Sequence, residues 1–392
     1  MMRRFLVWPS EMIWPYNLPF IAYLRTVHEK EAEFSLKWLN LTRLKFFIIV
    51  TVLSAVYYWL PYYIMPVLSF FSWTCMINPQ NNLLSQLTGS HGFAWGTLQL
   101  DWHFIQSTLG SPIVSPQWAQ YNILTGYILL LGIIMPVMYY KNLWNFKSFP
   151  INDSNFLADN GTYYNWDNPP IRFTVTYIVS YMFYFASLIA LIVHTIFYHG
   201  IDIFKQAKTS LQNRQNDIHC TLMSKYPEAS GWIYGVLFLC AFVCACFVCN
   251  FGKLMPWYLL FLAIPLAFVC LLPTGIVWAQ TNITIYVSYV CMVIGGLLLQ
   301  NNGTGNKTFV TYAFGTQFQA ISLLRSLKFG HFMKISPRAL FTTQLIITLL
   351  SSVVRYGVAY HMLSTVEGIC DTAANWQCSQ KDIYPYRFAL IG

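Results

Sequence analysis

Long apolar runs, separated by short polar or basic stretches, dominate the chain. The runs are continuous over about 20 residues, which is the length an α-helix needs to cross a bilayer. They lack the alternation of apolar and polar residues that a membrane β-barrel requires. The pattern predicts an all-α, polytopic transmembrane helical bundle that forms a single domain over residues 1–392. Clear spans are expected near 46–66, 119–140, 173–198, 231–250, 256–278, 283–300 and 340–363.

Several features predict that some of these membrane segments are broken or re-entrant. The apolar piece 309–324 has room only for a half-span, and 67–118 is too polar for an ordinary span. Non-helical backbone at membrane depth is tolerated where it lines a cavity, as in the broken helices of transporters. Ordinary helix packing around proline is the alternative. Prolines inside or at the ends of spans are Pro61, Pro66, Pro136, Pro265 and Pro273.

Composition supports the membrane class. The chain has 392 residues, of which 56% are hydrophobic and 9% are charged. Soluble domains carry about 25% charged residues, so this chain lacks the polar groups to cover a globular surface. The formal net charge of +9 does not indicate a nucleic-acid partner, because the cations fall in short clusters between apolar runs.

The distribution of lysine and arginine predicts orientation. Cytoplasmic loops carry an excess of these residues, so 25–45, 201–230 and 325–338 are predicted to be cytoplasmic. Alternation then places 364–384 outside. In this interpretation Leu327–Arg338 is a basic loop before the last span.

Two residues inside predicted spans are functional candidates, because ionisable groups are costly in a bilayer. Arg355 could hold a peptide carboxylate with both arms of its guanidinium, or it could extend to the lipid headgroups. His194 is a candidate for proton transfer, because the unperturbed histidine side chain changes its charge near physiological pH. It could equally be a buried histidine that bonds a neighbouring helix.

Polar residues in two other segments are candidates as well. Asp101 could line a cavity or be a hydrated loop residue. Asn78 and Asn81 could offer amides to a peptide backbone, although a turn explains them equally well. Lys334 and Arg338 could gate the cytoplasmic mouth or anchor the last span to headgroups. No metal-ligand cluster and no catalytic constellation is apparent, so no metal, cofactor or enzymatic activity is expected.

The segment before the last span resembles a signature of the oligopeptide transporter family, a lysine-isoleucine-proline-proline-arginine sequence. Ser336 replaces the first proline. Further short matches follow in order along the whole chain, beginning with Met12–Leu18. The resemblance implies proton-coupled uptake of small peptides, with glutathione or metal chelates as other cargoes, by a multi-pass protein of the plasma membrane. The matching signature residues are Gly330, His331, Met333, Lys334, Ile335, Pro337 and Arg338.

Two departures from the family keep alternatives open. Family members are considerably longer, so the chain is expected to be an internal portion of such a transporter, and a non-transporting fragment is one alternative. The proline and glycine of the family's asparagine-proline-glycine motif are absent around Asn282, and the glutamate that follows the motif in relatives has no counterpart here. If that carboxylate couples protons in relatives, proton coupling by this chain is in doubt. A seven-span chemosensory channel is the other alternative, since Thr311-Tyr312 and Gln317-Phe318 resemble a signature of those receptors.

A disulfide between Cys370 and Cys378 is predicted. Both cysteines lie in the loop assigned to the outside, where oxidation is favoured and their spacing allows closure. Relatives in the family also carry two cysteines in that loop. Mass spectrometry of unreduced peptides from surface-purified protein should find the two residues linked. Alkylatable thiols at both positions would refute the pairing.

Overall fold

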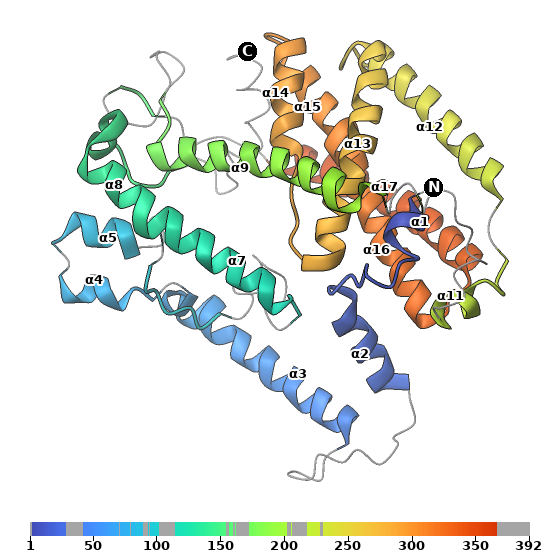
Figure 1. Cartoon of the computed structure of the whole chain (residues 1–392), viewed down its shortest axis with the longest axis horizontal. Helices are drawn as coiled ribbons and strands as arrows, with labels where there is room; N and C mark the ends of the chain where they lie inside the picture. The colour runs from blue at the N-terminus through green and yellow to red at the C-terminus, as the bar shows by residue number, and fades with distance from the viewer. Residues whose placement is uncertain are drawn as a thin grey trace. The chain divides into compact units, whose positions relative to one another are not determined.

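The structure is a computed structural model. It describes residues 2–28, 42–69, 71–78, 80–88, 93, 95–101, 114–153, 157–159, 161, 172–201, 205, 218–227 and 230–366. In these residues the regular structure is helical, which confirms the predicted all-α membrane fold (Figure 1). The chain divides into two compact units. Unit 1 contains residues 1–14, 191–280 and 284–392, and unit 2 contains 15–190 and 281–283.

Six helices in the described part of the chain are long and apolar enough to cross a membrane. They are Arg43–Ile64, Gln117–Tyr140, Val175–His199, Gly231–Phe251, Trp257–Thr281 and Pro337–Thr365. Each begins and ends within a few residues of a predicted span. Agreement at this level is expected, because a continuous apolar run of this length needs no distant partner to favour a helix.

The seventh predicted span differs. In place of a long helix over 283–300, α14 (Ser288–Leu298) has 11 residues. The preceding helix, α13 (Leu260–Thr281), ends where Asn282 adopts φ 65°, a left-handed conformation that asparagine tolerates. Residues 282–287 are not helical. A broken segment therefore separates α13 from α14.

The predicted half-span 309–324 is part of a longer continuous helical stretch. It contains α15 (Gly303–Val310), the π-helical segment η8 (Thr311–Gly315) and α16 (Thr316–Met333). The Asn302 side chain caps its start by accepting a hydrogen bond from the Gly305 amide at 2.8 Å. The expectation of a short piece was wrong, because the cations that suggested its end at 325–328 are accommodated within α16.

Irregular helical turns recur in unit 2. The helix α3 (Arg43–Trp59) continues into the π-helical segment η1 (Leu60–Ile64), which contains Pro61. The helix α7 (Gln117–Tyr127) continues into η3 (Ile128–Ile134) and then α8 (Met135–Tyr140), where Pro136 supplies no amide donor. Proline removes a helical hydrogen bond, and a π turn is one way to absorb the loss.

The remaining elements of unit 2 are short, apart from two helices. The stretch after η1 contains η2 (Pro66–Ser69), α4 (Trp73–Ile77) and α5 (Asn82–Thr88), with an isolated antiparallel bridge between Phe71 and Leu98. The described part of the polar stretch 67–118 is thus partly helical. The other elements are α2 (Asn17–His28), η4 (Leu143–Ser148) and α9 (Val175–His194). From residue 191 on, α9 and the following η5 (Thr195–His199) belong to unit 1.

Unit 1 is built on α13, α16 and the N-terminal segment, defined as residues 3–14. This segment contains α1 (Arg3–Leu6), which lies beside α16 (Figure 1). The Trp14 amide donates to the Ala279 carbonyl at 2.8 Å, and its indole donates to the Leu6 carbonyl at 2.7 Å. Side chains of the segment form a buried cluster with α13 and α16: Leu6, Val7, Trp8, Met12, Trp14, Leu271, Ile276, Trp278, Ala279, Ile321 and Leu324, with Cys220.

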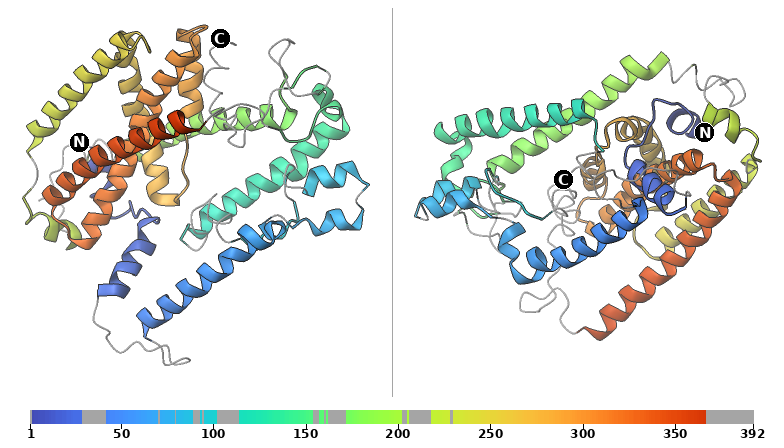
Figure 2. Two further views of the ribbon diagram at one scale, coloured as in Figure 1. Left: turned by 180° about the vertical axis from the view of Figure 1, so that it is seen from behind. Right: turned by 90° about the horizontal axis from the view of Figure 1, so that it is seen from below.

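The rest of unit 1 surrounds this cluster. The helix α12 (Gly231–Phe251) is followed by η7 (Trp257–Leu259), and α14 packs against α15. The last long helix, α17 (Pro337–Thr365), contacts α16 near the turn that joins them, and its length is clear in Figure 2. A short helix, α11 (Ile218–Met223), also contacts α16.

Replacing Lys328 with methionine should destabilise unit 1. Its ammonium donates to the carbonyls of Val7 and Pro9, and methionine would fill the space but leave two buried acceptors without that donor. We expect a loss of about 2 kcal/mol of unfolding free energy. Denaturant unfolding in detergent, followed by tryptophan fluorescence, measures it. Lys225→Met, at an exposed lysine, is the matched control. Equal stability of the two variants would show that Lys328 does not hold the segment.

Candidate functional site

The signature residues form the end of one helix and the beginning of the next. α16 ends at Lys334, which adopts φ 59°, and the amides of Lys334 and Ile335 both donate to the Gly330 carbonyl. This is the hydrogen-bonding pattern of a left-handed helix C-cap. Pro337 then occupies the first turn of α17, where its missing amide costs no helical bond. The predicted basic loop 327–338 is therefore mostly helical, and the turn itself is confined to residues 334–336.

Gly330 allows α16 and α17 to approach closely. A Cβ atom at this position would lie 2.8 Å from Cδ2 of Leu340. Contacts this short occur only if the neighbour shifts. The glycine of the signature thus has a packing role between the two helices.

Side chains from α11 meet the end of α16. Lys334 Nζ lies 2.6 Å from His219 Nδ1 and 3.2 Å from the His331 carbonyl oxygen. His331 is buried, and its Nε2 lies 4.0 Å from the Cys220 sulfur. The Cys220 thiol donates to the Trp8 carbonyl at 3.4 Å. The N-terminal segment, α11 and α16 therefore converge on one polar cluster, which we call the α16 cluster.

Lys328 lies one and a half turns before the end of α16 and is 2% exposed. Its ammonium donates to the carbonyls of Val7 at 2.8 Å and Pro9 at 3.0 Å, and lies 5.0 Å from the centre of the Phe332 ring. Carbonyl dipoles and an aromatic face compensate part of the cost of removing the charge from water. The same helix places Arg325 5.5 Å from the Trp278 ring.

The burial of Lys328 differs from the prediction, in which this lysine belongs to a basic loop at the membrane edge. A signal for its burial exists in the sequence. Ile321, Leu324, Lys328 and His331 recur every three or four residues, the spacing of one helical face, and all four are buried. A lysine in an apolar stripe is thus the feature that could have revealed the site.

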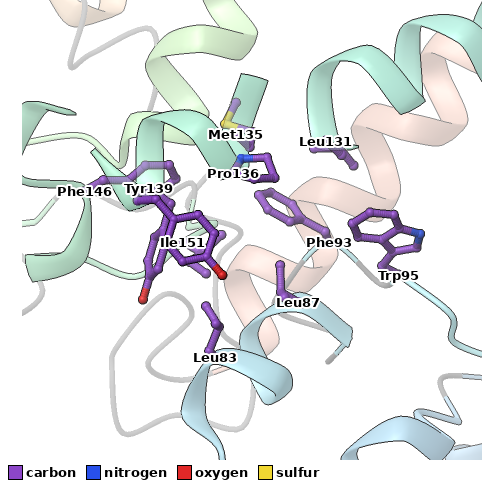
Figure 3. A pocket seen from close by; sticks show the side chains of 11 residues that line it. Leu83, Leu87, Phe93, Trp95, Leu131, Met135, Pro136, Tyr139, Phe146 and Ile151 are labelled. Carbon is purple, nitrogen blue, oxygen red and sulfur yellow. The ribbon is translucent and has the colours of Figure 1, made fainter. Parts of the chain in front are cut away.

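Unit 2 contains an apolar pocket, shown in Figure 3. Its walls come from α5, from the segments η3 and α8, and from the chain that follows them. Lys147, beside the pocket, lies 5.8 Å from the centre of the Tyr139 ring. The side chains that line the pocket are Leu83, Leu87, Phe93, Trp95, Leu131, Met135, Pro136, Tyr139, Tyr140, Phe146 and Ile151.

Comparison with known proteins identifies the family. The family model for the OPT oligopeptide transporter protein matches residues 1–388. The chain belongs to the OPT oligopeptide transporter family. It is 32% identical over 404 residues to Oligopeptide transporter 7 of Arabidopsis thaliana, covering 97% of this chain and 52% of the relative. It is 33% identical over 406 residues to Oligopeptide transporter 3 of the same plant, covering 96% and 54%.

The comparison confirms the resemblance found in the sequence and supports a multi-pass membrane protein. The chain spans about half the length of the curated relatives it matches. No solved structure matches it.

The predicted polar residues of unit 2 bind partners that are close to them in the structure. Asp101 is buried, and its Oδ2 accepts a hydrogen bond from Ser69 at 3.3 Å. The Asn81 side chain accepts from the Leu84 amide at 3.2 Å, and the Asn78 carbonyl accepts from the Asn81 amide. The two asparagines thus form a turn and a helix cap, the structural alternative weighed from the sequence.

The other two candidates lie on exposed helix faces. Arg355 is exposed in the middle of α17. His194 is exposed at the end of α9, where its ring lies 4.5 Å from that of Tyr198 and 5.8 Å from that of His199. These distances join ring centres. The His194 ring therefore contacts rings of the same continuous helical stretch, tilted against Tyr198 and edge-on to His199.

The structure describes some of the cysteines and possible metal ligands named from the sequence, and not others. Cys370 and Cys378 lie outside the described residues. Cys240, Cys244, Cys246 and Cys249 of α12 are free thiols. Over the part of the chain that the structure describes, no group of three or more histidine, cysteine, aspartate or glutamate side chains is arranged to hold a metal ion.

Proposed function

We propose that this protein transports small peptides across the plasma membrane, coupled to protons. The observation that supports the proposal most is the family match over residues 1–388, which includes the signature at Gly330–Arg338. The curated relatives are named oligopeptide transporters. Glutathione and metal–chelate complexes are further cargoes to test, because some family members move them.

The broken helices of unit 1 suit this function. A peptide crossing a membrane needs hydrogen-bond donors and acceptors at bilayer depth, and regular helices offer few. The non-helical residues 282–287, the π segment η8 and Pro273 within α13 each free backbone groups. Such sites are common in transporters.

A buried side-chain pair adds polar groups to the same region. Gln317 of α16 donates from Nε2 to Thr274 Oγ1 at 2.7 Å, and both residues are 2% exposed. Within the described structure, the other amide atom of Gln317, Oε1, is buried and has no hydrogen-bond partner. A buried acceptor costs free energy unless it binds a donor. A peptide N–H is one donor that would fit it.

Proton coupling rests on the family resemblance. The candidate from the sequence, His194, is exposed, and its ring is tilted against that of Tyr198. Exposure on α9 is compatible with contact to further parts of a transporter or to lipid. The peptide and the proton are the partners we propose, with the bilayer as the surrounding solvent and no nucleic acid.

Arg355→Lys tests the proposed contact with a peptide carboxylate. Lysine keeps the charge but loses the two-pronged hydrogen bond. We expect uptake of a free-acid peptide to fall about tenfold, which corresponds to ~1.4 kcal/mol. The C-terminally amidated peptide should be taken up less well by the unmutated protein, and the substitution should matter little for it.

Radiolabelled uptake in a peptide-transport-deficient host measures these rates. Arg25→Lys, at an exposed arginine of α2, is the matched control. Equal sensitivity of the acid and the amide to Arg355→Lys would show that Arg355 is a headgroup anchor. Absence of uptake for every peptide would contradict the proposed function itself.

A further inference from the structure

The α16 cluster contains a hydrogen bond that one proton would break. Lys334 Nζ lies 2.6 Å from His219 Nδ1. An ammonium has no lone pair, so it must be the donor, and Nδ1 must be unprotonated to accept. We propose that His219 is a proton-binding residue of the transport cycle, and that its protonation releases α11 from the α16–α17 turn. The role of His219 in transport rests on the proposed function. The protonation of its imidazole and the loss of the bond to Lys334 do not.

Protonation changes the contact from attraction to repulsion. An imidazolium has donors on both nitrogens, so it would face the ammonium as a second cation at hydrogen-bonding distance. The Lys334 backbone forms the C-cap of α16, and its Nζ also bonds the His331 carbonyl at 3.2 Å, so the ammonium keeps an acceptor on α16 when the imidazole is protonated. The mobile partner is then α11, a helix of 6 residues.

In the described structure, titratable side chains face His219 from α16 and from α11 itself. From α16, His331 faces it with ring centres 6.0 Å apart, and Lys334 bonds it. From α11 itself, Cys220 is the neighbour, and Lys328 lies further back on α16. Phe332 covers the ring with its edge at a centre-to-centre distance of 5.6 Å.

His219 is more accessible to solvent than His331. His219 is half-buried, whereas His331 is 2% exposed and lies 4.0 Å from the Cys220 sulfur. Charging a fully buried imidazole costs more than charging one in partial contact with water. The lower cost of charging a half-buried imidazole therefore favours His219 over His331 as the group that responds to pH.

Release of α11 would uncover Cys220. Its side chain is 0% exposed and its thiol donates to the Trp8 carbonyl at 3.4 Å. Both the burial and this bond depend on α11 staying against α16 and the N-terminal segment. The alkylation rate of Cys220 thus reports the state of the contact without any need for transport.

The test uses the full chain with Cys220 as its one cysteine, after replacement of the other nine of the ten cysteines. The purified protein in detergent is labelled with a small maleimide between about pH 8 and about pH 5, which brackets ordinary histidine titration. Each rate is divided by the rate for the unfolded protein at the same pH. This ratio corrects for the change in the thiolate fraction with pH. We expect the ratio to rise at least about tenfold on acidification.

Three variants test whether the pH dependence of Cys220 labelling comes from the His219–Lys334 contact. His219→Gln keeps an acceptor for Lys334 but has no proton to gain, so its ratio should stay low at every pH. His219→Arg places a fixed cation there and should be labelled at every pH. Lys334→Met removes the opposing charge and should lose the pH dependence. His361→Gln, at an exposed histidine on α17, is the matched control and should behave as the unmutated protein does.

A flat ratio in the unmutated background, or an undiminished rise in His219→Gln, would overturn His219 as the proton-binding residue. Peptide uptake against pH, measured in the same variants, decides its role in transport. A shifted pH profile in His219→Gln supports that role, and an unchanged profile overturns it. Labelling that follows the expected pattern without uptake by any variant would refute the transport proposal and leave the proton site standing.

Discussion

The structure of unit 1 depends on one charge. The ammonium of Lys328 is 2% exposed in a protein whose surroundings are apolar, and burying an uncompensated ammonium would cost many times the energy of an ordinary hydrogen bond. The carbonyls of Val7 and Pro9 compensate it from residues 321 and 319 positions away in the sequence. A helix from the far part of the chain is thereby tied to the N-terminal segment.

Other features of unit 1 follow from that attachment. Once the segment lies on α16, Leu6 occupies the space beside Gly275, where a Cβ atom would lie 2.7 Å from its Cδ1. Trp14 then bonds the last turn of α13 through its amide. Trp8 offers its carbonyl to Cys220, which brings α11 and His219 to the end of α16. The buried lysine and the His219–Lys334 bond are therefore two parts of one assembly around the signature turn.

The sequence predicts the membrane spans well and the assembly poorly, for a physical reason. An apolar run such as that of α12 favours a membrane helix by its own composition, so its position needs no tertiary information. The break after Asn282 and the continuity of α15 through α16 depend on backbone conformation and packing, which hydropathy does not contain. Pro337 predicts the start of α17 locally, but the partners of Lys328 are hundreds of residues away. For the substrate candidates Asn78 and Asn81 the sequence cannot separate two roles, because asparagine is common both in turns and in binding sites.

Amide hydrogen exchange of the unmutated protein tests the central claim most directly, namely that the N-terminal segment is part of the folded core of unit 1. The Trp14 amide is hydrogen-bonded to Ala279, so it should exchange only when the segment detaches. We expect peptides covering residues 5–14 to exchange as slowly as peptides from α16. Complete exchange of residues 5–14 at the rate of an unfolded chain, with α16 still protected, would contradict it.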